Sequence, residues 1–220
     1  MRYHGRMTDP RGLRERKKVR LRETIAATAI RMFLESGFDQ VSITDIARAA
    51  EVSRRTLFAY FPTKEDLVLQ RFADHEDEAA RIVRAHPDRP PLDALRAALL
   101  DALRQRDPAT GLNDNPETIA FLRLVRDTES LAARLMRYTA RGVDLLSDAL
   151  RENGFDPLTA RLVASQVIAV QHELTFMNLA YLAEGESAAD RYPAAVRATD
   201  HAYDLLRDGL KSHAGEGISP

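Results

Sequence analysis

Apolar residues recur along most of the chain at steps of three and four, the spacing that places them on one face of a helix. No stretch alternates with the period of two that marks a half-buried strand. The first run opens with a highly charged stretch at Arg14, and Gly37 supplies a C-terminal stop. Its apolar face is formed by Ile25, Ala26, Ala29, Ile30, Phe33 and Leu34. We therefore predict an all-α protein.

Two short helices are predicted next, over residues 43–50 and 54–60. Ser42 stands three residues before Asp45, so its hydroxyl can accept from an early backbone N–H while the carboxylate favours the positive end of the helix. Ser53 offers the N-cap of the second of these helices in the same way. The spacing thus indicates two capped helices joined by a turn of a few residues.

The rest of the chain is also predicted to be helical. Pro62 ends the third helix, because the residue before a proline is disfavoured in helical geometry. A single fourth helix is predicted over residues 63–85, and the break at "HPDRPP" ends it. Apolar positions then mark further helices at about 92–103, 119–125, 131–149, 157–181 and 194–211. We predict three segments: a flexible basic arm (1–13), a first domain (14–71) and a second helical domain (72–220).

Charge is divided unevenly between these domains. The net charge is −1, yet residues 1–71 hold 15 Lys and Arg against 9 Asp and Glu, while residues 72–220 hold 17 against 24. A basic first third joined to an acidic remainder suggests that only the first third meets a polyanion.

Several function classes lack support in the sequence. There is no cysteine, which excludes disulfides, thiolate metal sites and a cysteine nucleophile. No apolar run is long enough for a membrane span or a signal peptide, so we expect a cytoplasmic protein with no membrane partner. The "DHEDE" stretch lacks a second histidine at metal-ligand spacing, and no phosphate loop or nucleophile elbow is present. We expect neither an enzyme nor a cofactor.

The two short helices fit a helix-turn-helix reader of DNA. Their inward positions are apolar: Ile46, Ala47, Ala50, Val52 and Leu57. Four polar or basic side chains are left facing outward: Arg54, Arg55, Thr56 and Tyr60. An arginine can bond a guanine edge through two donors, and hydroxyls or a lysine can hold phosphates.

The stretch "SITDIARAAEVSRRTLFAYFPTKEDL" resembles the N-terminal domain of the TetR family of transcriptional regulators. The resemblance covers about residues 25–67 and implies base-reading positions at Thr44, Arg54, Arg55 and Phe58. It implies phosphate contacts from Ser42, Thr56, Tyr60 and Lys64. The chain departs from the family pattern at Phe58, where a tyrosine is usual and only apolar contact is left, and at Glu51, where glycine is common. If the turn at Glu51 is left-handed, a non-glycine costs on the order of 1 kcal/mol.

The basic arm leaves alternatives open. Its cations are Arg2, Arg6, Arg11, Arg14, Arg16, Lys17 and Lys18. An unspecific tail, a minor-groove contact and a phosphate contact all fit this composition.

For the second domain, the resemblance implies a ligand cavity and a homodimer built from the last two helices. Candidate interface residues are Val163, Val167, Val170, Leu174, Ala198, Ala202 and Leu206, which fit an intramolecular core equally well. Candidate pocket residues are Phe121, Met136, His172 and Phe176, although a lone histidine is more often a satisfied core residue.

The leading hypothesis is a homodimeric regulator that binds a pseudo-palindromic DNA operator and responds to an unidentified small-molecule effector. The family resemblance implies that it is a repressor. One rival is a helical small-molecule-binding protein or enzyme without DNA binding. The other is a DNA-binding factor without ligand control.

Overall fold

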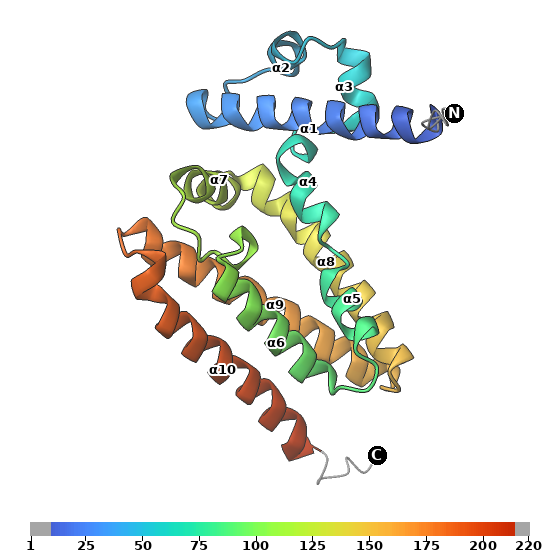
Figure 1. The fold of residues 1–220 in the computed structure, drawn as a ribbon, viewed down its shortest axis with the longest axis vertical. Coiled ribbons are helices and arrows are strands. Elements are labelled where there is room, and N and C mark those ends of the chain that lie inside the picture. Colours follow the sequence, from blue (N-terminus) through green and yellow to red (C-terminus); the bar gives the residue numbers. More distant parts are fainter. Residues whose placement is uncertain (1–9, 214–220) are drawn as a thin grey trace, which may run out of the picture. The chain divides into compact units, whose positions relative to one another are not determined.

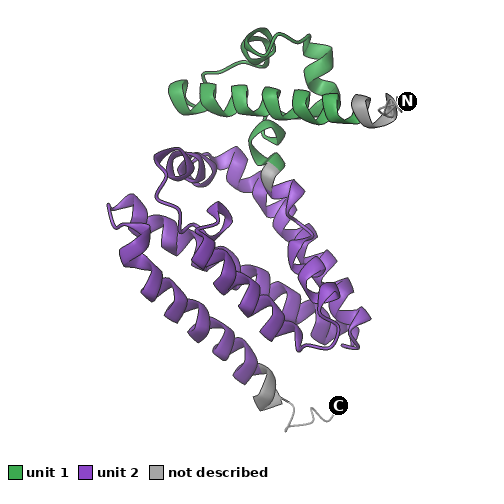
Figure 2. Ribbon diagram, in the orientation of Figure 1, with its two compact units in different colours: residues 1–70 green, residues 71–220 purple. Residues whose placement is uncertain are grey.

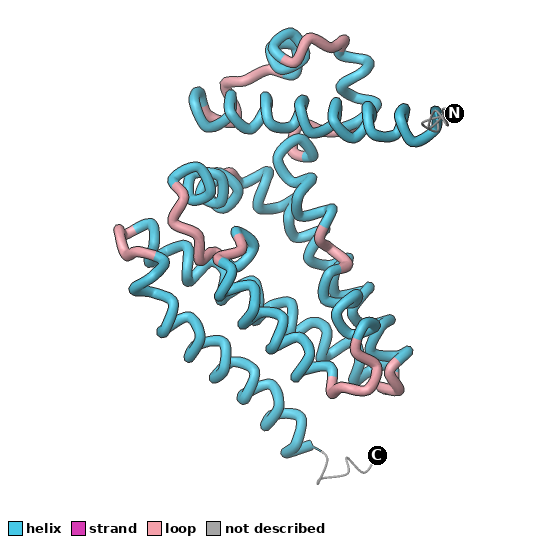
Figure 3. Tube along the Cα trace, viewed as in Figure 1, coloured by secondary structure: helices cyan, strands magenta, loops and turns pink. Residues whose placement is uncertain are grey.

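The structure, a computed structural model, describes residues 10–213 and the side chains of residues 15–70 and 72–209. Every regular element in that part of the chain is a helix, which confirms the predicted all-α class (Figures 1 and 3). The elements are α1 (Pro10–Ser36), α2 (Ile43–Ala49), α3 (Arg54–Tyr60), α4 (Asp66–Asp74), α5 (Glu78–Ala85), α6 (Pro91–Gln105), the 3₁₀ turn η1 (Pro108–Thr110), α7 (Pro116–Asp127), α8 (Glu129–Glu152), α9 (Pro157–Ala183) and α10 (Ala188–His213). No described helix is both long enough and apolar enough to cross a membrane.

The chain divides into two compact units, residues 1–70 and residues 71–220 (Figure 2). The first unit holds α1, α2, α3 and the start of α4, and the second holds the later helices. The division lies one residue before the predicted transition and falls within α4.

In the first unit, α1 supplies the long side of the core. Its buried residues Ile25, Ala29 and Phe33 stand four apart and form one stripe along the helix. α1 packs against α2 and α2 against α3, and both short helices lie on the same side of α1 (Figure 1). Ile46 of α2 and Leu57 of α3 are fully buried, so the apolar pattern predicted for the helix-turn-helix does build the core.

α1 begins at Pro10, four residues before the predicted start. Proline is favoured at the first helical position, because the N–H that it lacks has no helical partner there. Residues 10–13, predicted as part of a flexible arm, are therefore helical, which corrects that prediction. Residues 1–9 of the arm lie outside the described residues.

The single helix predicted over residues 63–85 is two helices, α4 and α5. Four of the five residues at the break are acidic: Asp74, Glu76, Asp77 and Glu78. Like charges one turn apart oppose a continuous helix, whereas carboxylates favour the start of a new one. The Glu76 carboxylate also pairs with Arg141 of α8 (Nε–Oε1 2.7 Å), and its carbonyl lies against Gly142. Contacts with α8 thus fix a break that helical periodicity does not reveal.

The second unit is a layered bundle in which α8 packs on α5 and α9, and α10 packs on α6 and α9. Its largest buried cluster includes Val83, Leu95, Leu146, Leu150, Val163, Val167, Tyr203 and Leu206. The Tyr203 hydroxyl accepts a hydrogen bond from Gln171 Nε2 at 3.1 Å. Burial raises the pKa of Tyr203 to about 12.

α10 begins at Ala188, six residues before the predicted start. Ser187 opens it: its Oγ accepts from the Asp190 N–H at 3.1 Å and donates to the Asp190 carboxylate at 2.7 Å. This reciprocal cap fixes the start, and Pro193 lies inside the helix.

The turn η1 is docked tightly on α9. Thr175 Oγ1 donates to the Ala109 carbonyl, and Asn178 Nδ2 to the Thr110 carbonyl, both at 3.0 Å. Gly111 has φ +70, and a Cβ there would stand 2.0 Å from the Thr175 carbonyl oxygen. Only glycine permits this approach.

Candidate nucleic-acid interface

Ser42 opens α2 and holds its first turn. Its Oγ accepts from the Asp45 N–H at 3.1 Å and donates to the Asp45 carboxylate at 2.5 Å. The Ser42 hydrogen bond lowers the pKa of Asp45, and the neighbouring Arg48 acts in the same direction. The Ser42 hydroxyl would have to donate the same proton to a phosphate that it now donates to Asp45. A phosphate contact from Ser42 therefore requires the hydrogen bond to Asp45 to open. Thr44, the predicted base-reading residue of α2, is exposed beside the cap.

The turn between α2 and α3 is a Schellman motif with Glu51 in the left-handed position. The Val52 N–H donates to the Ala47 carbonyl at 2.9 Å and the Glu51 N–H to the Arg48 carbonyl at 3.2 Å. Glu51 has φ 55, so the turn is left-handed and the cost considered above for a residue other than glycine applies. Val52 is held next to Ala47, which fixes the angle at which the chain enters α3.

α3 presents its basic end to solvent. Ser53 Oγ accepts from the Thr56 N–H at 3.0 Å and lies 2.8 Å from the Thr56 hydroxyl. Leu57 is buried, whereas Arg54 and Arg55 are exposed. No acidic side chain pairs with either arginine in the described part of the chain. Both guanidinium groups are therefore available to a partner.

The remaining predicted contacts of this region differ in exposure. Phe58 is 41% exposed on α3, so a large part of this apolar side chain is open to solvent. Tyr60 is half-buried at the end of the helix. Both lie on the element that carries the two arginines.

Lys64 has an intramolecular role that the sequence did not indicate. Its ammonium donates to the Phe38 carbonyl and lies 4.4 Å from the centre of the Phe38 ring. Burial lowers the pKa of Lys64. An ammonium has three donors, so a phosphate contact would add to this anchor and need not replace it.

These features match known regulators. Residues 25–70 fit the family described as bacterial regulatory proteins, tetR family. The chain is also 35% identical over 190 residues to MftR of Mycobacterium tuberculosis, a transcriptional regulator named for mycofactocin biosynthesis, with 84% of this chain and 89% of that protein covered. The chain belongs to the tetR family. This confirms the resemblance drawn from residues 42–67 and makes the protein a transcriptional regulator with a DNA-binding helix-turn-helix.

Two further proteins are similar to this chain, one in sequence and one in fold. The regulator TcmR of Streptomyces glaucescens is 32% identical over 128 residues, a match that spans 57% of each chain. The crystal structure of NalD, the secondary repressor of the MexAB-OprM multidrug efflux pump in Pseudomonas aeruginosa, superposes with a TM-score of 0.56 at 18% identity. The superposition covers 83% of this chain and 96% of NalD. At 18% identity this similarity supports the fold alone.

The four predicted pocket residues of this tetR-family chain do not gather around one cavity. Phe121 faces Phe72 at 6.3 Å between ring centres, and His172 faces Phe176 at 4.6 Å. Met136 is 61% exposed on α8, which contradicts a place inside an enclosed pocket of one subunit. None of the four lines the hollow that the structure shows between α6 and α10.

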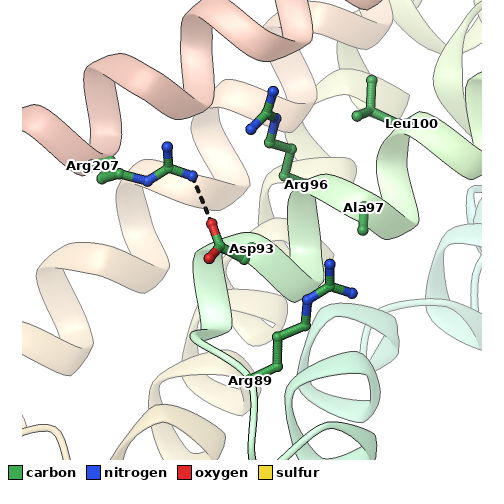
Figure 4. A pocket seen from close by; sticks show the side chains of 6 residues that line it. All are labelled: Arg89, Asp93, Arg96, Ala97, Leu100 and Arg207. Carbon is green, nitrogen blue, oxygen red and sulfur yellow. Dashed lines mark hydrogen bonds and ion pairs between the residues drawn. The ribbon is translucent and has the colours of Figure 1, made fainter.

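That hollow lies on the surface between α6 and α10 and measures about 450 Å³ (Figure 4). Ion pairs cross it: Arg207 Nη2 lies 2.6 Å from Asp93 Oδ1, and Arg96 Nη2 lies 2.7 Å from Asp200 Oδ1. Arg207 and Arg96 are thus each matched by a carboxylate, and Arg89 is a third arginine in the lining. The hollow is best described as an ion-paired layer that holds α10 to α6.

The predicted dimer residues are mostly internal to one subunit. Val163, Val167, Leu174 and Leu206 are buried, and Val170 packs against the same cluster. Buried side chains have no surface left to offer a partner, so the four buried residues belong to the core, the alternative that the sequence left open, and Val170 is half-buried beside them. Ala198 and Ala202 are half-buried on α10.

A different face of α9 and α10 is apolar and exposed. Leu158 and Leu162 of α9 are 68% and 52% exposed, and Leu205 of α10 is 61% exposed. On α9, steps of four and three lead from Leu158 through Leu162, Ser165, Ala169 and His172 to Phe176. This second stripe was not predicted from the sequence, although its apolar residues recur at the same steps of four and three as the predicted seam.

Proposed function

We propose that this tetR-family regulator is a repressor that binds a pseudo-palindromic operator as a homodimer and releases it when a small molecule binds the second unit. The observation that carries the proposal is the open N-terminal end of α3. There, two exposed arginines without acidic partners stand on a capped helix whose entry is fixed by the Schellman turn.

The roles within the reading head follow from chemistry. Arg54 and Arg55 each supply a planar fork of donors that matches a guanine edge. Phe58 offers apolar contact to a thymine methyl, and Thr44 reaches the same groove from α2. Thr56, Tyr60 and Lys64 are proposed to hold phosphates, which set the register without reading sequence.

The second stripe on α9 and α10 supports a homodimer. A long helix that is apolar on opposite faces needs cover on both sides, and the subunit core covers one of them. Leu158, Leu162 and Leu205 would be buried by a second copy, and Ala198 on α10 is small enough for close helix packing. Two reading heads would then address half-sites about one helical turn, roughly 34–36 Å, or a multiple apart.

Effector control would pass through α4, the helix in which the two units join. A ligand shifts the equilibrium between DNA-competent and DNA-incompetent states only by binding them with different affinity. The aromatic residues around Phe121 and Phe176 remain the proposed lining, since they are half-buried in the second unit and are not part of its main cluster.

The reading head is tested with the double variant Arg54→Ala/Arg55→Ala. An operator is first selected from random duplexes with the wild-type protein, and both proteins are then titrated with it in a gel-shift assay. Each bidentate pair discriminates by about 1–3 kcal/mol, so four arginines in a dimer give an expected loss on the order of 10³-fold or more.

The matched control is Arg31→Ala/Arg81→Ala, which removes two exposed arginines outside α2 and α3. Circular dichroism should show that both variants stay folded, and only the control should retain the selected operator. Equal affinity and sequence preference for the wild type and the Arg54/Arg55 variant would refute the proposed reading head.

A further inference from the structure

The N-terminal half of α1 is a strongly basic helix that takes little part in the core. Residues 15–20 are all exposed, and the first buried residue of α1 is Ile25. Residues 15–22 carry five cationic side chains, namely Arg16, Lys17, Lys18, Arg20 and Arg22, and one acidic side chain, Glu15. Core packing therefore does not account for this part of the helix.

Apart from the ion pair between Glu15 and Lys18 (3.8 Å), the charges of this segment do not stabilise the helix on its own. The first turn of α1 holds no acidic residue, although carboxylates are favourable near the positive end of a helix and cations are not. Cations one turn apart, such as Arg16 and Arg20, repel each other as well. A bound polyanion would remove both penalties.

The position of this segment relates it to the reading head. The guanidinium carbon of Arg22 lies 5.8 Å from the centre of the Phe61 ring, and Phe61 is the residue at which α3 ends. From Arg22 the helix continues back to Pro10, and Figure 1 shows this half of α1 extending beyond α3 within the first unit. Twelve residues at about 1.5 Å each give a rod of roughly 18 Å.

For the residues that are helical, the structure excludes a minor-groove contact of the kind an extended arm makes. A helix with its side chains is about 10–12 Å across, whereas the minor groove of B-DNA is only about 6 Å wide. Residues 10–22 therefore cannot thread the minor groove as an extended arm does. The phosphates that flank the groove are the part of DNA that such a rod can reach.

We infer that residues 15–22 of α1 form a phosphate-binding extension that lengthens the DNA contact beyond the recognition helix. The inference rests on the proposed DNA binding. It assigns part of the sequence-independent affinity for DNA to this segment of α1. Arg16 and Arg20 lie on one side of the rod and Lys18 and Arg22 on another, so several phosphates can be contacted per subunit. These contacts contribute affinity and salt dependence but no sequence preference.

The test is the quadruple variant Arg16→Gln/Lys17→Gln/Lys18→Gln/Arg20→Gln, which leaves Arg22 on Phe61. Its affinity for the selected operator is measured from low to high salt. Each lost phosphate contact reduces the slope of log K against log salt by about 0.9, so one to four contacts per subunit predict a dimer slope shallower by about 2 to 7. Hydroxyl-radical footprinting should show protection lost only at the edges of each half-site.

The matched control removes four exposed arginines of the second unit: Arg81, Arg104, Arg137 and Arg151, each changed to Gln. The control should keep the wild-type slope, and the α1 variant should keep the wild-type sequence preference. An unchanged slope in the α1 variant, or an equal change in the control, would overturn the inference while leaving the reading head intact. Binding of the wild type to phosphatidylserine vesicles with no change in DNA slope would also overturn it. A wild type that selects no operator would instead refute the proposed function.

Discussion

Replacing Glu51 with glycine tests whether the turn between α2 and α3 is under conformational strain. Glu51 occupies the left-handed position of a Schellman motif with φ 55, where glycine is the residue most often found. The variant removes a Cβ and a charge from an exposed residue and leaves both hydrogen bonds of the motif in place. We expect a more stable first unit.

The magnitude follows from two opposing terms. A side chain in the left-handed region costs about 1–2 kcal/mol, and glycine costs about 0.5–1 kcal/mol through the greater freedom of its unfolded chain. The net gain in the free energy of unfolding should be about 0.5–1 kcal/mol. That corresponds to a rise in Tm of up to about 4 °C if both units unfold together, and up to about 8 °C if the first unit unfolds alone.

Urea denaturation followed by circular dichroism measures the gain, and two other caps calibrate it. Arg106 ends α6 with φ 54 in the same motif, so Arg106→Gly should stabilise the second unit by a similar amount. Gly154 ends α8 with φ +96, and Gly154→Ala should lose about 1 kcal/mol or more. A Cβ at Gly154 would have no atom within 4 Å, so that loss reports backbone strain alone.

The control for charge is Glu51→Ala, which keeps the Cβ in the left-handed turn. If Glu51→Ala stabilises the protein as much as Glu51→Gly does, charge and not strain is responsible, and the reasoning from φ fails. Removing the carboxylate beside the reading head should raise DNA affinity equally in both variants, since phosphates repel it.

Three other outcomes follow from the second unit. Gly111→Ala should lose about 3 kcal/mol or more, because its Cβ would meet the Thr175 carbonyl at 2.0 Å in a left-handed turn, and a lower urea midpoint measures this. Tyr203 has its pKa raised from 10.0 to about 12, so its stabilising effect is complete below pH 10 and is lost, by about 3 kcal/mol, as pH rises to about 12. Tyr203→Phe should abolish that part of the pH dependence in alkaline denaturation. Leu162→Glu combined with Leu205→Glu should convert the proposed dimer to a folded monomer in sedimentation, and an unchanged mass would exclude this face.

The first unit could be predicted closely from the sequence because its signals are local. Ser42 and Ser53 cap the two short helices as predicted, and Ile46 and Leu57 are buried as their spacing required. The left-handed turn at Glu51, considered because glycine is common at that position of the family pattern, is also present. Local hydrogen bonds of this kind are encoded within a few residues.

Features that depend on distant residues were not predictable in this way. The break between α4 and α5 depends on Arg141 and Gly142 of α8, more than 60 residues away in the chain. The docking of η1 on α9 likewise depends on Thr175 and Asn178. Periodicity indicates where a helix can form, but long-range contacts decide where it stops.

The face of α9 that was predicted for the dimer interface is buried in the subunit, and this error also comes from long-range contacts. Val163, Val167 and Leu174 on one face, and Leu158, Leu162 and Phe176 on the other, show the same alternation of steps of four and three. Such a pattern requires a packed partner for each face but does not say which partner comes from the same subunit. The β-branched face packs into the core with Tyr203, which leaves the exposed leucines as the face for the proposed second copy. Two apolar stripes on one helix therefore support the proposed dimer, and burial within one subunit identifies the stripe that the dimer would cover.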